Sequence, residues 1–576
     1  MPAGALPTGG TVVHGDATIN QSGTQLDINQ STQKGIINWQ SFSIGADAHV
    51  RFNQPDASSI TLNRVTGGDP SHILGQLTAN GQVMLINQNG ILFGAGAKID
   101  VAGLVATTSD ISDSNFINGN YNFAAMPNAA GAVVNEGEIT IRDGGLAALV
   151  APTVRNSGTI VAKLGRVALA AGETFTLDFY GDQLVQFAVP ASAGTVSIEN
   201  SGKIHTDGGK VLLSAATAKG VVDGVINMDG IVEARSVGVK NGVIVLDGGE
   251  AGTVNVAGTL DASDSVTLNA QTVNLNAAIT LDALATLSGN ATEVNVGSGG
   301  LIQNGVDVAA AGATVNVAAG TYAEAVTVNK QGLTISGAEG AKLAVAEGQT
   351  GFTIAANDVT VEGMEIVGPN DATYTAIDWD ATPNSFGVWV NPNVTNVTIR
   401  DNTIRDVRTG IYVNNGVSGT ITGNVIDNTK GGVLVRQDGS TVTITGNRED
   451  AVGNEWGIVY NLGNVEKLGE EADATRQAFL LDTSGDNDGM SVLDRGYSKS
   501  NRTHVFVDDD STATDADDFG FGNGLGNANQ ALKTIAQGID AVVAGGTVTV
   551  RAGTYNESVT IDKALTLDGE GAGTTR

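Results

Sequence analysis

The feature that most constrains this chain is a short repeat in its second half. Four apolar runs recur at spacings of 23, 22 and 25 residues, each opened by a glycine: Gly387, Gly410, Gly432 and Gly457. Between the runs lie three Thr-Ile segments, which end in Asn402, Asn424 and Asn447. A period near 22 residues is too short for an independent domain, but it matches one coil of a parallel β-helix with about three short strands.

Stacked coils place each apolar residue on its counterpart in the next coil, so a continuous aliphatic core is buried. We expect Asn402, Asn424 and Asn447 to form an internal ladder in which each side-chain amide bonds the next. Glycine supplies corners with positive φ. The sequence therefore predicts an all-β chain, folded as a right-handed parallel β-helix (solenoid).

The first half carries a related pattern, apolar-x-Asn-x-Gly-x-apolar. It occurs at residues 133–139, 154–160 and 198–204. The longer gap before the third copy contains a strand-like stretch, residues 174–189, which we interpret as a short hairpin extruded from the coil.

A third repeat links two distant segments. Residues 315–330 and 548–563 are identical at ten of sixteen positions, at an offset of 233 residues. Apolar residues at helical spacing precede the second copy within residues 527–544, which predicts a helix that caps an open β-helix end. Because the chain stops soon after this second module begins, we expect it to be a fragment of a longer protein.

Composition excludes several classes of function. The formal net charge of −31 repels phosphate backbones, so nucleic acid is not an expected partner. The chain has no cysteine, which excludes disulfide scaffolds, thiolate metal sites and cysteine nucleophiles. The sequence shows no run of about 18 apolar residues and no signal peptide, and its first residues resemble a mature N-terminus given a new Met.

A series of ordered motifs occupies residues 36–172. These are IINW at 36–39, FNQPDASSITLNRVTGGDP at 52–70, SHILGQL at 71–77, INQNGILFG at 86–94, GLVATT at 103–108 and LGRVALAAG at 164–172. Over residues 6–190 the chain closely resembles the secretion domain of two-partner secretion exoproteins of the filamentous-haemagglutinin type.

This resemblance implies a partner, an outer-membrane β-barrel transporter with periplasmic recognition domains, which threads the chain outward. The domain would then nucleate coil-by-coil folding outside the cell. The family turn usually reads Asn-Pro-Asn-Gly; here Gln88 replaces proline, and the turn geometry can survive because Asn89 and Gly90 still tolerate αL. The secretion-recognition residues so implied are Asn63, Arg64, Asn87, Gln88, Asn89 and Gly90. A plain β-helix corner is an equally weighted interpretation of residues 87–90.

The segments that begin near residues 305 and 505 resemble pectin-lyase-like, carbohydrate-binding β-helices, through VDD at 507–509, GTYNE at 553–557 and LTLDG at 565–569. That fold includes polysaccharide-degrading enzymes, but fold alone confers no activity. The five histidines are scattered, and we find no Gly-His-Gly and no Arg-x-Lys pair on successive coils. We therefore assign no catalytic residue and expect no enzyme.

Two candidate binding features remain. Trp389 and Tyr412 occupy equivalent coil positions and would stack on sugar rings if they face outward; filling of the coil core is the alternative. Asp486 and Asp488 partly fit a calcium loop, although Arg495 stands where the loop needs Glu. Calcium is the one cofactor considered.

The predicted domains are a secretion domain at 1–195, β-helix repeats at 196–300, a pectin-lyase-like module at 301–465, an acidic linker at 466–526 and a truncated second module at 527–576. The predicted protein is a secreted, surface-associated adhesin of a Gram-negative bacterium that binds cells or matrix polysaccharide. The alternatives are the stalk of a contact-delivered toxin and a polysaccharide-degrading enzyme.

Overall fold

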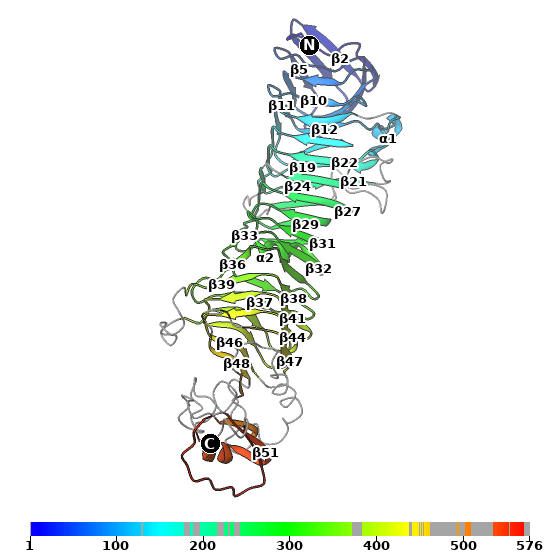
Figure 1. Cartoon of the computed structure of the whole chain (residues 1–576). Coiled ribbons are helices and arrows are strands. Elements are labelled where there is room, and N and C mark those ends of the chain that lie inside the picture. The colour runs from blue at the N-terminus through cyan, green and yellow to red at the C-terminus, as the bar shows by residue number, and fades with distance from the viewer. Residues whose placement is uncertain are drawn as a thin grey trace. The chain divides into compact units, whose positions relative to one another are not determined.

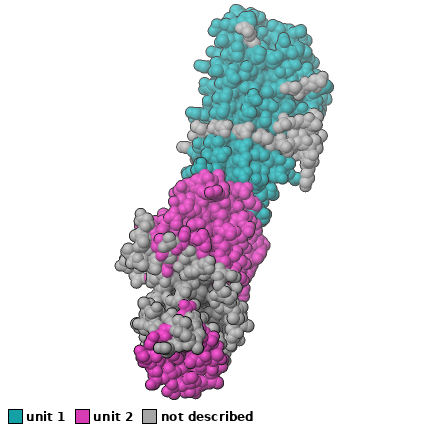
Figure 2. Space-filling view, in the orientation of Figure 1, with its two compact units in different colours: residues 1–313 teal, residues 314–576 magenta. Residues whose placement is uncertain are grey.

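The structure is a computed structural model. The chain forms two compact units, Met1–Ala313 and Thr314–Arg576 (Figure 2). The structure describes residues 2–127, 131–177, 185–187, 196–215, 224–228, 231–234, 242–370, 383–436, 440–448, 450, 452, 454–460, 492–494, 502–507, 534–551 and 553–569. The calcium candidates Asp486 and Asp488 lie outside these residues. The predicted domain boundaries stay predictions.

In the first unit, one face of the solenoid is a ten-stranded sheet (Figure 1). Its strands are β2 (Ala17–Ser22), β3 (Gln25–Gln30), β5 (His49–Asn53), β8 (Gln76–Ala79), β11 (Lys98–Val101), β15 (Glu138–Ile141), β18 (Thr159–Ala162), β23 (Lys203–His205), β26 (Ile231–Ala234) and β28 (Thr259–Ala262). From β3 onward the strands pair in parallel, and Leu77, Ile99 and Ile139 lie in register with exposures of 1% or less. This register builds the predicted aliphatic core.

Two further runs of parallel strands complete the coils of this unit. One contains β4 (Lys34–Trp39), β6 (Ile60–Val65), β9 (Gln82–Ile86), β12 (Gly103–Thr107), β16 (Leu146–Ala151), β19 (Arg166–Ala171), β24 (Lys210–Ser214), β27 (Val243–Val256), β29 (Ser265–Leu275) and β30 (Thr286–Gly289). The other contains β7 (Ser71–Ile73), β10 (Ile91–Phe93), β14 (Ala132–Asn135), β17 (Thr153–Asn156), β22 (Val196–Asn200) and β25 (Gly224–Met228), and continues through β27 and β29 to β31 (Ala291–Val296).

Antiparallel pairs close the N-terminal end of the first unit. Strand β1 (Thr11–His14) pairs antiparallel with β4, and β2 pairs antiparallel with β3. Such a cap covers core residues that an open first coil would expose. The predicted N-terminal cap is therefore confirmed.

A helix and three short strands project from these coils. They are α1 (Asp113–Asn118), β13 (Asn122–Phe123), β20 (Phe175–Leu177) and β21 (Val185–Phe187). Strand β20 pairs antiparallel with both β13 and β21. The extruded hairpin predicted within residues 174–189 is thus present, and β13 adds a third strand that the sequence did not suggest.

The second unit has coils of three strands, in agreement with the 22-residue period. Three sheets build these coils. The first contains β35 (Thr334–Gly337), β38 (Thr360–Glu362), β41 (Val397–Arg400), β44 (Ser418–Thr422) and β47 (Thr441–Thr445), and the second contains β33 (Gly320–Tyr322), β36 (Ala341–Ala344), β39 (Glu365–Val367), β42 (Thr403–Arg405) and β45 (Val425–Asp427). The third contains β34 (Val326–Val328), β37 (Thr350–Ile354), β40 (Phe386–Val390), β43 (Thr409–Val413), β46 (Thr429–Val435), β48 (Asn454–Tyr460) and β49 (Val492–Asp494).

The predicted amide ladder is confirmed inside the second unit. Asn402 Nδ2 donates to Asn424 Oδ1 at 3.0 Å, and Asn424 Nδ2 donates to Asn447 Oδ1 at 2.8 Å. All three side chains are at most 1% exposed. Each amide also donates to a backbone carbonyl, so the buried polar groups are paired.

The 233-residue repeat begins earlier than sequence identity alone suggested. Helix α2 (Ile302–Val308) runs directly into β32 (Ala309–Val317), and α4 (Ile535–Ala541) runs directly into β51 (Val542–Val550), each at the same offset. Strand β51 pairs with β50 (Arg502–Val507) and β52 (Thr566–Gly569). The predicted helix before the second copy is therefore present, although shorter than residues 527–544.

No helix among the described residues is long and apolar enough to cross a membrane.

Candidate functional site

The Asn-Gln-Asn-Gly segment forms a tight turn directly after β9. Gly90 N donates to Asn87 O at 3.0 Å, and of the four residues only Gly90 has positive φ, at 107°. With negative φ at Gln88 and Asn89, the turn is type I. Asn89 does not use the αL conformation that it would tolerate, because a type I turn needs none there. Proline is favoured at the second position of this turn, so the family proline and Gln88 fit the same backbone.

The two asparagines fasten the turn to the preceding coil. Asn87 is fully buried, and its Nδ2 donates to Asp69 O and Ser71 Oγ, both at 3.0 Å. Its Oδ1 accepts from Asn89 N at 2.9 Å, and Asn89 Nδ2 donates to Gly67 O at 3.1 Å. The turn is therefore a rigid corner, in which only Gln88 and Asn89 are partly exposed.

Gly90 lies close against the backbone of the next coil. A Cβ at this position would lie 3.0 Å from Ala132 O in the next coil. Its carbonyl also accepts from Ser71 N at 3.0 Å, so the backbone is held between two coils. The positive φ and the close approach both favour glycine at this position.

Asn63 and Arg64 point to opposite sides of β6. Asn63 is fully buried; it accepts from Trp39 Nε1 at 3.0 Å and donates to Met84 O at 3.2 Å. Strand pairing sets Arg64 beside Ile86, one residue before the turn. Asn63 is thus a core residue of the coil, and Arg64 lies on the outer face.

Arg64 holds the segment that begins α1. Its guanidinium contacts Asp110 at 2.9 Å, Asp113 at 2.9 Å and Ile111 O at 2.7 Å. Burial lowers the pKa of Arg64, but hydrogen bonds and charges from the two aspartates outweigh it, so the pKa is raised. The positive charge of Arg64 is therefore paired with two aspartates of the same domain, and its contacts are intramolecular.

Asp56, which is not among the residues predicted above, orders the loop before β6. Its Oδ1 accepts from Ser58 N at 2.8 Å and Ser59 N at 3.0 Å, and its Oδ2 accepts from Gln33 Nε2 at 2.8 Å. The Gln33 bond, followed by those from Ser58, lowers the pKa of Asp56 far below its ordinary value. The Pro-Asp-x-Ser-Ser spelling of this turn is the signal that identifies it.

Lys34, on β4, is a second functional residue that is not among those predicted above. Lys34 Nζ donates to Phe116 O and Ile117 O, both at 2.9 Å, and lies 5.7 and 5.6 Å from the ring centroids of Phe116 and Tyr121. Burial lowers the pKa of Lys34. No local pattern marks it, because its partners lie more than eighty residues away.

The aromatic pair of the second unit faces outward. Trp389 and Tyr412 are in register and half-buried, and the flanking Val388, Val390 and Ile411 fill the core. The two rings stack with centroids 4.4 Å apart and planes 4° apart, while Phe386 contacts both edge-on. The three rings form an apolar patch on β40 and β43, which we call the aromatic patch.

The described residues contain no group of three or more His, Cys, Asp or Glu side chains that would hold a metal ion. The calcium candidates lie outside the described residues and stay a prediction.

Comparison with known proteins identifies two regions. The model of the TPS secretion domain matches residues 3–262, and that of the right handed beta helix region matches residues 310–448. Two heme/hemopexin-binding proteins of Haemophilus influenzae are 37% and 31% identical to this chain, over 46% and 41% of its length. The alignments cover only 30% and 27% of those relatives.

A solved structure, the HMW1 secretion domain from Haemophilus influenzae, aligns at 27% identity with a TM-score of 0.45, over 70% of this chain and 98% of its own. None of the matched families or proteins is described as an enzyme. The sequence matches and the parallel coils together identify residues 3–262 as the secretion domain of a two-partner secretion exoprotein, a class that Gram-negative bacteria secrete, and residues 310–448 as a right-handed β-helix.

Proposed function

We propose that an outer-membrane transporter with periplasmic recognition domains reads the secretion domain at the turn formed by residues 87–90. The match over residues 3–262 supports an export role. Within the turn, Asn87 and Gly90 are buried and structural, whereas Gln88 and Asn89 are partly exposed. Contact with the transporter therefore falls on Gln88 and Asn89, and Asn63, Arg64, Asn87 and Gly90 act by building the corner.

Secretion measurements with the transporter test this division of roles. Gln88→Lys puts a long cation on the exposed position of the turn and leaves the bonds of Asn87 and Asn89 in place. We expect secretion to fall while the purified variant unfolds at the same urea concentration. Gln76→Lys, at an exposed position of β8, is the matched control and should be secreted normally. Normal secretion of the Gln88 variant would refute recognition at this turn.

We also propose that the exported protein is a surface-associated adhesin that binds polysaccharide through the aromatic patch. The support is the outward position of Trp389 and Tyr412 on a β-helix. Apolar ring surfaces of this kind pack against the C–H faces of sugars. Because the two rings cover one another, the exposed ring edges and Phe386 would form the contact surface.

A glycan-array measurement on the whole chain tests the adhesin proposal. The double variant Trp389→Ala/Tyr412→Ala should lose the glycans that the parent chain binds. Thr360→Ala, on a different sheet of the same unit, is the control. Heme and hemopexin belong among the probes, because the relatives are named for binding them. If the double variant still bound these glycans, the binding site would not be the aromatic patch.

A further inference from the structure

One outer face of the first unit is apolar. Along β6, β9, β12, β16 and β19, both faces of the strands are buried, and β16 is buried at all six positions. An outward-facing strand surface is normally polar, so an apolar one must be covered. The outward side chains that form this face are Ile60, Leu62, Met84, Ile86, Val105, Leu146, Ala148, Val150, Ala168 and Ala170.

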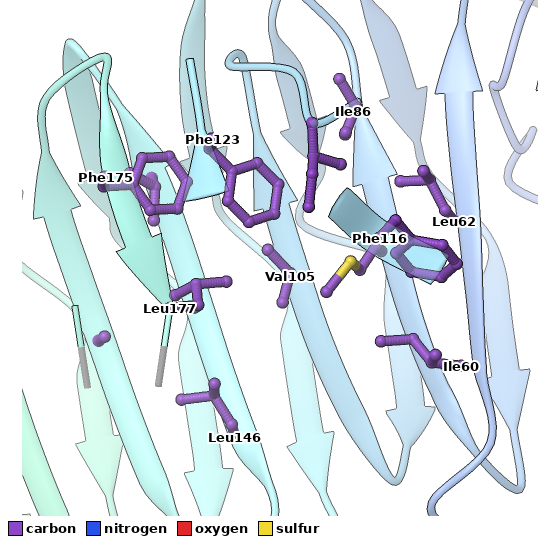
Figure 3. Close-up of a cluster of buried hydrophobic side chains, with 14 of the residues drawn as sticks. Ile60, Leu62, Ile86, Val105, Phe116, Phe123, Leu146, Phe175 and Leu177 are labelled. Atoms are coloured by element: carbon purple, nitrogen blue, oxygen red, sulfur yellow. The ribbon is translucent and has the colours of Figure 1, made fainter. Parts of the chain in front are cut away.

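The cover is a small assembly that we call the strap: residues 110–124, which include α1 and β13, together with β20. It places Phe116, Phe123, Phe175 and Leu177 on the apolar face, each at most 3% exposed (Figure 3). Phe123 and Phe175 stack with centroids 4.6 Å apart and planes 4° apart. The strap is therefore held to the coils mainly by apolar side chains.

Two cations from neighbouring coils hold the two ends of α1. Arg64 contacts Asp110 and Asp113 at its N-terminal end, and Lys34 donates to the carbonyls of Phe116 and Ile117 at its C-terminal end. A cation at the last carbonyls of a helix is favourable, because these carbonyls carry the negative end of the helix dipole. Both cations project outward from β4 and β6, which pair in parallel.

The coils beneath keep their own hydrogen bonds. Strands β6, β9, β12, β16 and β19 are joined in register by backbone pairing that involves no strap residue. Lifting the strap therefore breaks the Lys34 and Arg64 contacts and the apolar packing, but no bond of the coil ladder. Elements with this property open locally, at a lower free energy than global unfolding.

We infer that the strap opens and closes as one unit, pinned by Lys34 and Arg64, above coils that stay folded. Because β13 pairs with β20, the strap is complete only when residues 122–123 have met residues 175–177. If the chain emerges from its N-terminus during export, which rests on the proposed function, the apolar face is not fully covered until residue 177 has emerged. Strap closure is then the last folding step of this part of the domain.

Hydrogen exchange on the purified full chain tests the strap without any secretion step. Lys34→Met keeps the aliphatic stem and removes the ammonium group. We expect exchange to become roughly tenfold faster in residues 113–123 and 175–177 together, because a charge-assisted pair of bonds is lost, with unchanged protection in β14 to β18. Arg155→Met breaks the exposed Arg155–Glu199 pair and is the matched control.

A crosslink within the strap tests whether its two parts move as one unit. Asn122 and Thr176 face each other across β13 and β20, with a side-chain hydrogen bond of 2.8 Å, and the chain has no other cysteine to interfere. Because both cysteines belong to the strap, the disulfide leaves the strap free to lift, and in the oxidised Asn122→Cys/Thr176→Cys background Lys34→Met should still accelerate exchange in residues 113–123 and 175–177 together. Unchanged exchange in Lys34→Met, or loss of protection throughout the unit, would overturn the inference. Acceleration confined to residues 113–123 in the chain without the disulfide would show that the two parts open separately and would also overturn the inference.

Discussion

The side-chain amide of Asn135 donates to Asn156 Oδ1 at 2.7 Å, inside the core of the first unit. Asn156 Nδ2 in turn donates to Asn200 Oδ1 at 2.7 Å, and Asn200 Nδ2 lies 3.3 Å from Met228 Sδ. All three asparagines are at most 1% exposed. The same amide-to-amide hydrogen bonding occurs in the ladder of the second unit, so each unit contains a row of hydrogen-bonded asparagines within its apolar core.

Removing the central amide should be costly. Asn156→Ala leaves the Asn135 donor and the Asn200 acceptor buried and unpaired, and we expect a loss of about 2–4 kcal/mol in the free energy of unfolding. Asn274→Ala is the matched control, since Asn274 bonds Asn255 and Asn295 in an outer, partly buried ladder. Its cost should be at most about 1 kcal/mol. Urea unfolding followed by circular dichroism measures both; equal costs would contradict the role of burial.

The corner turn predicts two substitutions of opposite sign. Gly90→Val forces a β-branched residue to φ 107° and against Ala132 O, and should cost about 1–3 kcal/mol. Gln88→Pro restores the family residue at a position where type I turns favour proline, and should add about 0.4–1 kcal/mol. Thermal unfolding of the two variants and the parent chain shows which variant is less stable and which is more stable. If Gln88→Pro lowered the stability, the assignment of a type I turn would be wrong.

The Gly-Thr-Tyr-x-Glu motif predicts a helix cap. Glu557 accepts from Ile535 N at 2.7 Å and Ala536 N at 3.0 Å, at the start of α4. Glu557→Ala should cost about 0.5–2 kcal/mol, because two backbone donors lose their acceptor. Hydrogen exchange in α4 and β51 reports the loss. Asp562→Ala, an exposed acidic residue in the same module, should leave that exchange unchanged.

Acid should loosen the loop before β6. The folded state lowers the pKa of Asp56, so its bonds stabilise the fold fully above the ordinary aspartate pKa. This stabilisation declines as pH falls below that value and is lost as pH falls through the folded-state pKa. We expect exchange of the Ser58 and Ser59 amides to accelerate between roughly pH 4 and pH 2, beyond the intrinsic pH effect. In Asp56→Asn the acceleration should be absent. If exchange in Asp56→Asn still accelerated over this pH range, another carboxylate would be responsible for the acceleration.

The Tyr of the same motif shows why its two copies look alike. Tyr322 Oη donates to Ala318 O at 2.9 Å, and Tyr555 Oη donates to Arg551 O at 3.2 Å, at the same offset of 233 residues. Both tyrosines tie a turn to the backbone four residues earlier. The motif therefore builds the module start, and no sugar-binding role is needed to explain its recurrence.

Spacing alone determined the coils, the inner ladder of Asn402, Asn424 and Asn447, and the extruded hairpin, because a stacked solenoid repeats local geometry and its contacts follow the period of the sequence. Only the tertiary structure decided that Trp389 and Tyr412 face outward. Strand alternation places Trp389 on the opposite face of its strand from Val388 and Val390, but both faces carry apolar side chains, so alternation does not show which face is the core. The strap pinned by Lys34 and Arg64 was likewise beyond the sequence. Its contacts span 82 and 46 residues and follow no repeat, so nothing local encodes them.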